Sequence, residues 1–124
     1  MATVLIADDD PDLRESLRLL LELHGHDVDE ARNGEEALRR LAAGRRPCVI
    51  VLDLMMPVMD GWQFRRAQLQ DPALAPIPVL VISAIPSHMR RASELDARRI
   101  FSKPFDYDEL LSEVDRLCPN PPAA

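Results

Sequence analysis

The chain has 124 residues, 47% of them hydrophobic, and a formal net charge of −6. This length predicts a single globular domain, too short for a catalytic module plus a separate output domain. The negative charge argues against nucleic acid or an anionic membrane surface as the main partner. No apolar run approaches the roughly 20 residues that a membrane span needs. The N-terminus has no basic start or cleavage signal, so we expect a cytoplasmic protein.

The first half of the chain predicts alternating strands and helices. An apolar strand over 3–7 ends in three aspartates. Pro11 follows, which suits the first turn of a helix with Asp10 as its cap. A short strand near 27–31 leads through Asn33 and Gly34 into a second helix that stops at about Gly44.

The second half repeats this alternation. The β-branched run 48–54 reads as a buried strand with Asp53 near its end, followed by a loop and a helix from Gly61 to about Gln70. A buried strand over 78–83 precedes a weaker helix through Met89, Ala92 and Leu95. The last elements are a strand over 99–103 and a helix that Asp106 caps. We expect a domain over 1–118 and a disordered proline-rich tail over 119–124.

Five strands alternating with five helices predict an α/β three-layer sandwich around a parallel sheet. In the flavodoxin-like form of this fold the strand order is 2-1-3-4-5, and ligands bind at the carboxyl ends of the strands. Five polar side chains fall at predicted strand ends: Asp8, Asp9, Asp53, Ser83 and Lys103.

Three of these side chains are carboxylates, which repel one another unless a cation lies between them. Magnesium fits better than calcium, which favours a ligand-dense loop that we do not find. A carboxylate, a magnesium ion, a hydroxyl and an ammonium group are together the parts that phosphoryl transfer needs. Lys103 is the single lysine beside fourteen arginines, which favours a specific role over that of a surface cation.

Simpler interpretations stay open for some of these residues. Asp8 or Asp9 could cap a helix, although Asp10 already suits that role. For Ser83, a phosphoryl contact and a purely backbone-satisfying role are equally supported. His24 and His26 do not share a helical face, so we expect no metal pair there. Two cysteines do not make a disulfide framework.

The chain resembles the response-regulator receiver domains of bacterial two-component signalling, of the stand-alone, single-domain type. The resemblance runs from about Thr3 to Leu117 and is carried by four motifs: Ile6-Ala7-Asp8-Asp9-Asp10, Asp53-Leu54-Met55-Met56-Pro57-Val58-Met59-Asp60-Gly61, Val81-Ile82-Ser83-Ala84 and Ser102-Lys103-Pro104-Phe105. It implies a phosphorylation-controlled switch, not a conventional enzyme.

The resemblance also implies a role for each site residue. Asp53 would accept a phosphoryl group from a phosphohistidine on a sensor histidine kinase or a histidine phosphotransfer protein. Asp8 and Asp9 would hold Mg²⁺ together with Asp53 and the backbone carbonyl of Met55. Ser83 and Lys103 would contact phosphoryl oxygens, and the bond from Lys103 to Pro104 would be cis. Phosphorylation would change the affinity of one face for an unidentified protein target.

Two departures from the family pattern bear on this mechanism. The family usually has a tyrosine or phenylalanine that swings inward with Ser83, where this chain has Ile100. Phe101, one place later, faces the other side of the strand. Met55 and Ile85 occupy the two positions that border the path of hydrolytic water, and neither side chain can orient water by hydrogen bonding. We therefore expect a subtle conformational change and slow dephosphorylation.

Three other functions remain as alternatives. A constitutive docking or scaffold module, seldom phosphorylated, would explain Ile100 but not the retained acidic site. A flavin-binding protein would need a phosphate-cradling loop where Asp8, Asp9 and Asp10 stand. A phosphatase of the haloacid-dehalogenase type would need an aspartate at the position of Met55.

Overall fold

The computed structural model describes residues 3–44, 46–85 and 87–119, without the side chains of residues 88, 89, 92 and 93. Residues 120–124, most of the predicted tail, lie outside this description. The strands are β1 (Thr3–Ala7), β2 (Asp27–Ala31), β3 (Val49–Asp53), β4 (Val79–Ser83) and β5 (Arg99–Ser102). The helices are α1 (Pro11–Leu23), α2 (Gly34–Ala42), α3 (Gly61–Gln70), α4 (His88–Arg91) and α5 (Tyr107–Leu117), and a 3₁₀ turn, η1, covers Ala92–Leu95.

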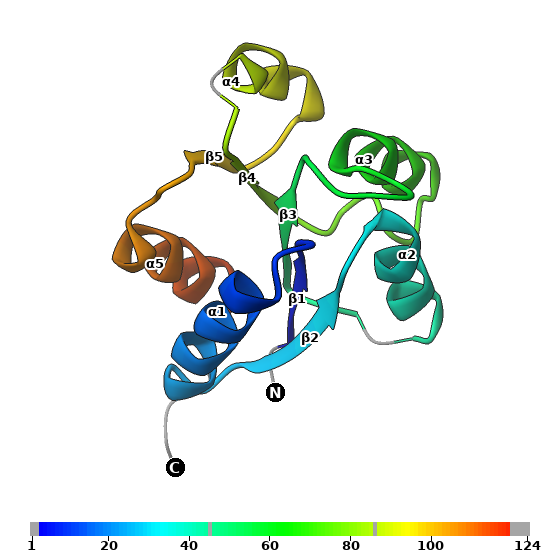
Figure 1. The fold of residues 1–124 in the computed structure, drawn as a ribbon. Coiled ribbons are helices and arrows are strands. Elements are labelled where there is room, and N and C mark those ends of the chain that lie inside the picture. The colour runs from blue at the N-terminus through cyan, green and yellow to red at the C-terminus, as the bar shows by residue number, and fades with distance from the viewer. Residues whose placement is uncertain (1–2, 45, 86, 120–124) are drawn as a thin grey trace.

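The five strands form one parallel sheet in the order β2-β1-β3-β4-β5 (Figure 1). This confirms the predicted fold class and strand order. β3 and β4 are buried at every position, as expected for central strands covered on both faces. The register pairs Ala7 with Leu52 and Asp53 with Ile82, so the ends of β1, β3 and β4 lie along one edge of the sheet.

Two hydrophobic clusters, one on each face, hold the helices against the sheet. One cluster joins the sheet to α2, α3 and η1 through Ala37, Phe64 and Leu95. The other joins it to α1 and α5 through Leu17 and Val114. The helices therefore divide into α1 and α5 on one side and α2 and α3 on the other (Figure 1).

The fourth predicted helix is much shorter than expected. Four helices have nine or more residues, whereas α4 has four and passes directly into η1. Among the side chains of this segment that the structure describes, Leu95 lies in the buried cluster, while Arg91 and Glu94 are exposed. Asp96, with a left-handed φ of 53°, ends the turn.

The two cysteines contradict the sequence interpretation. Cys48 and Cys118 are bonded as a disulfide, with their Cα atoms 5.5 Å apart. They lie 70 positions apart in the chain, but the start of β3 and the end of α5 meet in the same buried cluster. Sequence spacing carries no information on this contact, which only the folded topology creates.

The two histidines after α1 share one partner on α5. His24 Nδ1 lies 2.8 Å from one oxygen of Asp115, and His26 Nε2 lies 2.7 Å from the other. Partial burial opposes ionisation of Asp115, but the hydrogen bonds from His26 and His24 hold its pKa below the ordinary value.

The described part of the chain contains no helix long and apolar enough to cross a bilayer.

Candidate functional site

A cluster of charged side chains lies at the carboxyl edge of the sheet. Asp8 follows β1, Asp53 ends β3, Ser83 ends β4 and Lys103 follows β5. Parallel strands place their carboxyl ends at the same edge, which explains why residues far apart in sequence meet here. The backbone N–H of Lys103 donates to the carbonyl of Ser83 at 2.7 Å, so β5 stays paired with β4 up to the site.

Three carboxylates form the core of the cluster. Asp8, Asp9 and Asp53 each offer an oxygen, and these oxygens lie within 4.8 Å of one another. Asp8 and Asp53 are buried, whereas Asp9 is exposed. The backbone N–H of Asp10 donates to Asp8 Oδ1 at 2.8 Å, and that of Met55 donates to Asp53 Oδ1 at 3.1 Å. These bonds orient both carboxylates, and the second oxygen of each accepts from Lys103.

Lys103 supplies the positive charge of the cluster. Its Nζ lies 2.9 Å from Asp8 Oδ2 and 3.4 Å from Asp53 Oδ2. Partial burial opposes the charge on this ammonium group, but Asp8 and Asp53 together hold the pKa of Lys103 above its ordinary value. The lysine therefore stays protonated and bridges the two buried carboxylates.

The ionised form of the Asp53 carboxylate is nevertheless disfavoured in this site. Burial, followed by repulsion from Asp8, raises the pKa of Asp53 from 3.8 to about 6. The N–H of Met55 and the ammonium group of Lys103 oppose this shift without cancelling it. One ammonium group is thus insufficient compensation for the clustered carboxylates.

The donor set fits a hard divalent cation. All the ligand atoms are carboxylate oxygens, and a bound cation would offset the repulsion that raises the pKa of Asp53. Among the described residues, no other group of three potential metal ligands lies this close together. The cluster is therefore a candidate magnesium site, as the strand ends predicted.

Ser83 lies at the end of β4 and is almost fully buried. Its Oγ accepts a hydrogen bond from the backbone N–H of Ile85 at 3.2 Å, so the hydroxyl has a local backbone partner. This contact matches the simpler interpretation left open by the sequence. The bond from Lys103 to Pro104 is cis, as the resemblance implied.

The loop after Asp53 is held tightly against the strand. The N–H of Gly61 donates to the carbonyl of Leu54 at 3.1 Å, and a Cβ on Gly61 would overlap the carbonyl oxygen of Asp53. Asp60 and Gln63 form a reciprocal capping box that fixes the start of α3. Glycine is thus required at position 61 because α3 begins in direct contact with the end of β3.

The remaining predicted residues surround the cluster without joining it. The side chain of Met55 is half exposed, and Ile85 is partly buried. Ile100 packs against the cluster on the α2 and α3 side of the sheet, whereas Phe101 packs against the cluster on the α1 and α5 side. The structure thus confirms that Phe101 faces away from Ile100.

Arg14 was not singled out by its sequence context, yet it contacts the site. Its guanidinium donates to the backbone carbonyl of Asp8 at 2.7 Å and pairs with Glu30 at 3.1 Å. Arg14 therefore links β1, α1 and β2 directly behind the acidic cluster. Its spacing four residues after Asp10 is an ordinary helical one, and only the packing of α1 on β2 gives it this position.

Comparison with known proteins identifies the family of the chain. The sequence profile of the family described as "Response regulator receiver domain" matches residues 4–115. The response regulator MprA of Mycobacterium sp. strain KMS is 41% identical over 116 residues, which is 92% of this chain and 49% of MprA. The DNA-binding regulator RpaA of Synechocystis is 35% identical over 94% of this chain and 49% of RpaA. The chain spans about half the length of these curated relatives.

Solved structures give the same result. The signal receiver domain of a histidine kinase from Syntrophus aciditrophicus has a TM-score of 0.87 and 32% identity, covering 100% of this chain and 98% of that one. The response regulator TrrA of Thermotoga maritima has a TM-score of 0.83 and 29% identity, covering 94% of this chain and 99% of that one. TrrA was solved in complex with Mg²⁺ and BeF.

Proposed function

The chain belongs to the response regulator receiver domain family, and from this we propose that Asp53 accepts a phosphoryl group from a phosphohistidine donor. The observation that carries the proposal is the buried Asp53 carboxylate, which lies within reach of both Lys103 and the Asp8 and Asp9 oxygens. A histidine kinase or a histidine phosphotransfer protein is the donor of this chemical class.

The proposed phosphoryl transfer uses Asp53, Lys103 and Ser83. A carboxylate oxygen of Asp53 attacks phosphorus, the bond from phosphorus to the donor imidazole nitrogen breaks, and that nitrogen keeps the electron pair and then takes a proton. The product on this chain is an acyl phosphate. Its added negative charge lies beside the ammonium group of Lys103, and Ser83 donates its hydroxyl to a phosphoryl oxygen after leaving its local backbone partner.

Magnesium would be held by Asp8, Asp9 and Asp53 with the backbone carbonyl of Met55. When bound, it neutralises charge on the transferring oxygens. The protein residues position the reacting groups: the N–H of Met55 orients Asp53, and the N–H of Asp10 orients Asp8.

We also propose that the acyl phosphate decays slowly, because neither Met55 nor Ile85 offers a side-chain hydrogen bond to attacking water.

The signal would leave the site through the face that includes β5. Ser83 and Ile100 are the residues we assign to this step. Ile100 is smaller than an aromatic residue and partly buried, so its rearrangement exposes less new surface. We therefore propose a subtle change in affinity for a downstream protein target, with the chain acting in the cytoplasm.

The proposal is tested by the intact mass of the wild type after incubation with acetyl phosphate, with and without Mg²⁺. We expect the mass of one phosphoryl group to be added only when Mg²⁺ is present. Asp53→Asn should take up none, whereas Asp27→Asn, which alters an exposed carboxylate at the start of β2, should react like the wild type.

The second candidate function is a constitutive docking module, and Ile100 is the observation that favours it. A folded wild type that takes up no phosphoryl group from either acetyl phosphate or a phosphohistidine donor would overturn the switch and leave this alternative. Uptake that persists in Asp53→Asn would instead show that another residue is the acceptor.

A further inference from the structure

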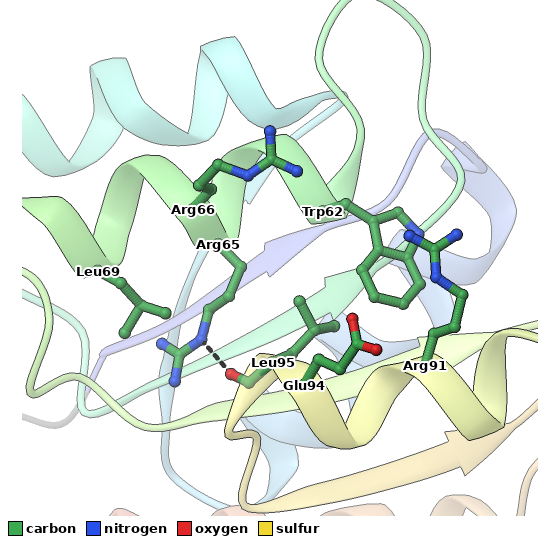
Figure 2. Close-up of a pocket in the computed structure, with 7 residues that line it drawn as sticks. All are labelled: Trp62, Arg65, Arg66, Leu69, Arg91, Glu94 and Leu95. Carbon is green, nitrogen blue, oxygen red and sulfur yellow. Dashed lines mark hydrogen bonds between the residues drawn. The ribbon is translucent and has the colours of Figure 1, made fainter.

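A groove lies between α3 and the segment formed by α4 and η1 (Figure 2). Its volume is about 170 Å³, and Trp62, Leu69 and Leu95 give it an apolar lining. Leu69 is one of the few large hydrophobic side chains of the described chain that is substantially exposed, at 44%. Leu69 thus offers open apolar surface at the groove, whereas Leu95 is buried and the Arg91 guanidinium lies over the Trp62 ring.

Arginines surround this apolar surface. Arg65, Arg66 and Arg91 line the groove together with a single carboxylate, that of Glu94. Arg91 places its guanidinium 4.7 Å from the centre of the Trp62 ring, and Arg66 extends from α3 at the rim, away from Arg65 (Figure 2). In a protein of net charge −6, this surface is therefore locally positive.

None of the three arginines has an ion-pair partner within the described parts of the chain. Most of the other described arginines, such as Arg14, Arg18, Arg40 and Arg99, pair with a carboxylate. Arg65 is the clearest case, because it is only 4% exposed. It donates to the carbonyls of Leu95 at 2.8 Å and Asp96 at 3.0 Å and to Gln68 at 2.7 Å, all of them uncharged acceptors. Burial lowers its pKa from the ordinary value, and the charge of Asp96 offsets this only in part.

The three arginines therefore have different roles in the groove. Arg65 ties α3 to the end of η1 and so fixes the width of the groove. Arg66 and Arg91 are exposed, and their guanidinium groups have donors free for a ligand. Guanidinium groups bind carboxylates in a planar, two-point geometry, so a carboxylate-bearing ligand suits this rim.

We propose that the groove between α3 and the α4–η1 segment binds a short acidic segment of a partner protein, with glutamates or aspartates on Arg66 and Arg91 and an apolar side chain on Leu69 and Trp62. This site is separate from the phosphoacceptor cluster and does not require phosphorylation. The apolar lining favours a peptide over a nucleic acid, because a phosphate backbone has no apolar side chain to pack on Leu69 and Trp62.

The probe is an acetylated hexapeptide of four glutamates and two leucines. Its binding is followed by calorimetry and by the indole N–H resonance of Trp62, which is unambiguous because the chain has one tryptophan. We expect saturable binding that weakens with added salt. The double variant Arg66→Gln/Arg91→Gln should bind about fivefold more weakly or worse, since two exposed charge pairs are lost.

Two controls make the result specific. The variant Arg39→Gln/Arg46→Gln removes the same charge from exposed sites outside the groove and should bind like the wild type. The groove variant should still take up one phosphoryl group from acetyl phosphate, which separates this proposal from that for Asp53. Equal affinity in both double variants, or a peptide that leaves the Trp62 resonance unchanged, would overturn the proposal. Tighter binding of a DNA or RNA oligonucleotide, or groove-dependent self-association, would replace the peptide by that occupant.

Discussion

At the scale of single residues, the site is a balance between one ammonium group and clustered carboxylates. Lys103 bridges Asp8 and Asp53, yet the pKa of Asp53 remains near 6 because burial and Asp8 outweigh it. A bound cation would stabilise the ionised form of this carboxylate, whereas its ionisation in the metal-free protein costs free energy. The acidic cluster thus favours binding of a divalent ion and lowers the stability of the metal-free protein.

This balance predicts a pH-dependent stability. Because the folded pKa of Asp53 lies above its ordinary 3.8, its stabilising contribution is fully present below about pH 4 and is lost as the pH rises through about 6. In metal-free buffer, Asp53→Asn should therefore gain stability over the wild type at pH 7.5, by about 1–2 kcal/mol after allowance for partial solvation, and almost none at pH 4.

Thermal unfolding of both proteins in a chelator at pH 4, 5, 6 and 7.5 measures this difference. Asp27→Asn is the matched control, and its difference from the wild type should not follow the same curve. A gap between Asp53→Asn and the wild type that is constant over the whole range would show that Asp53 titrates normally. Added Mg²⁺ should raise the melting temperature of the wild type at pH 7.5 and not that of Asp53→Asn.

At the scale of elements, the strands were the most predictable part of the chain. Apolar, β-branched runs specify β1, β3 and β4 closely, because strands buried on both faces need such residues along their whole length. The α4 segment was not predictable in this way. The segment contacts α3 through Leu95 and Arg65, and a local sequence pattern carries no trace of those contacts.

Two loops at the carboxyl edge predict the lifetime of the phosphorylated form. Met55 lies in the loop after β3 and Ile85 in the loop after β4, and both loops follow strand ends at the edge of the sheet that carries Asp53. Met55→Asn places a hydrogen-bonding group on the water path that we propose, so dephosphorylation should accelerate about fivefold, the equivalent of one hydrogen bond of about 1 kcal/mol. The decay of the phosphorylated mass after removal of acetyl phosphate measures the rate.

Met55→Leu is the matched control, since it keeps an apolar side chain of similar size at the same half-exposed position. Its decay rate should equal that of the wild type. A rate for Met55→Asn that is indistinguishable from that of Met55→Leu would remove these loops as determinants of the lifetime.

At the scale of the whole molecule, the histidine and cysteine contacts that escaped sequence analysis join distant segments. Asp115 receives both His24 and His26 across 91 and 89 positions, and Cys48 meets Cys118 across 70. Each attaches α5 to the end of the sheet opposite the acidic cluster. The sequence shows that these residues exist, but only the strand order and the packing of α5 beside α1 bring them together.

The disulfide between Cys48 and Cys118 should stabilise the fold without changing the phosphoacceptor chemistry. It closes a long loop, so its reduction should lower the free energy of unfolding by about 2–4 kcal/mol. In a reducing compartment the same sulfurs stand as thiols, and α5 is then held by the buried cluster, by Asp115 and by the ion pairs of Arg99 with Glu109 and Glu113. Urea unfolding with and without dithiothreitol measures the difference, and the double variant Cys48→Ala/Cys118→Ala should not respond to the reductant.

Equal stability of the oxidised and reduced wild type would contradict a stabilising role of the disulfide. Uptake from acetyl phosphate should be the same in all of these forms, because the disulfide lies at the start of β3 and Asp53 at its end.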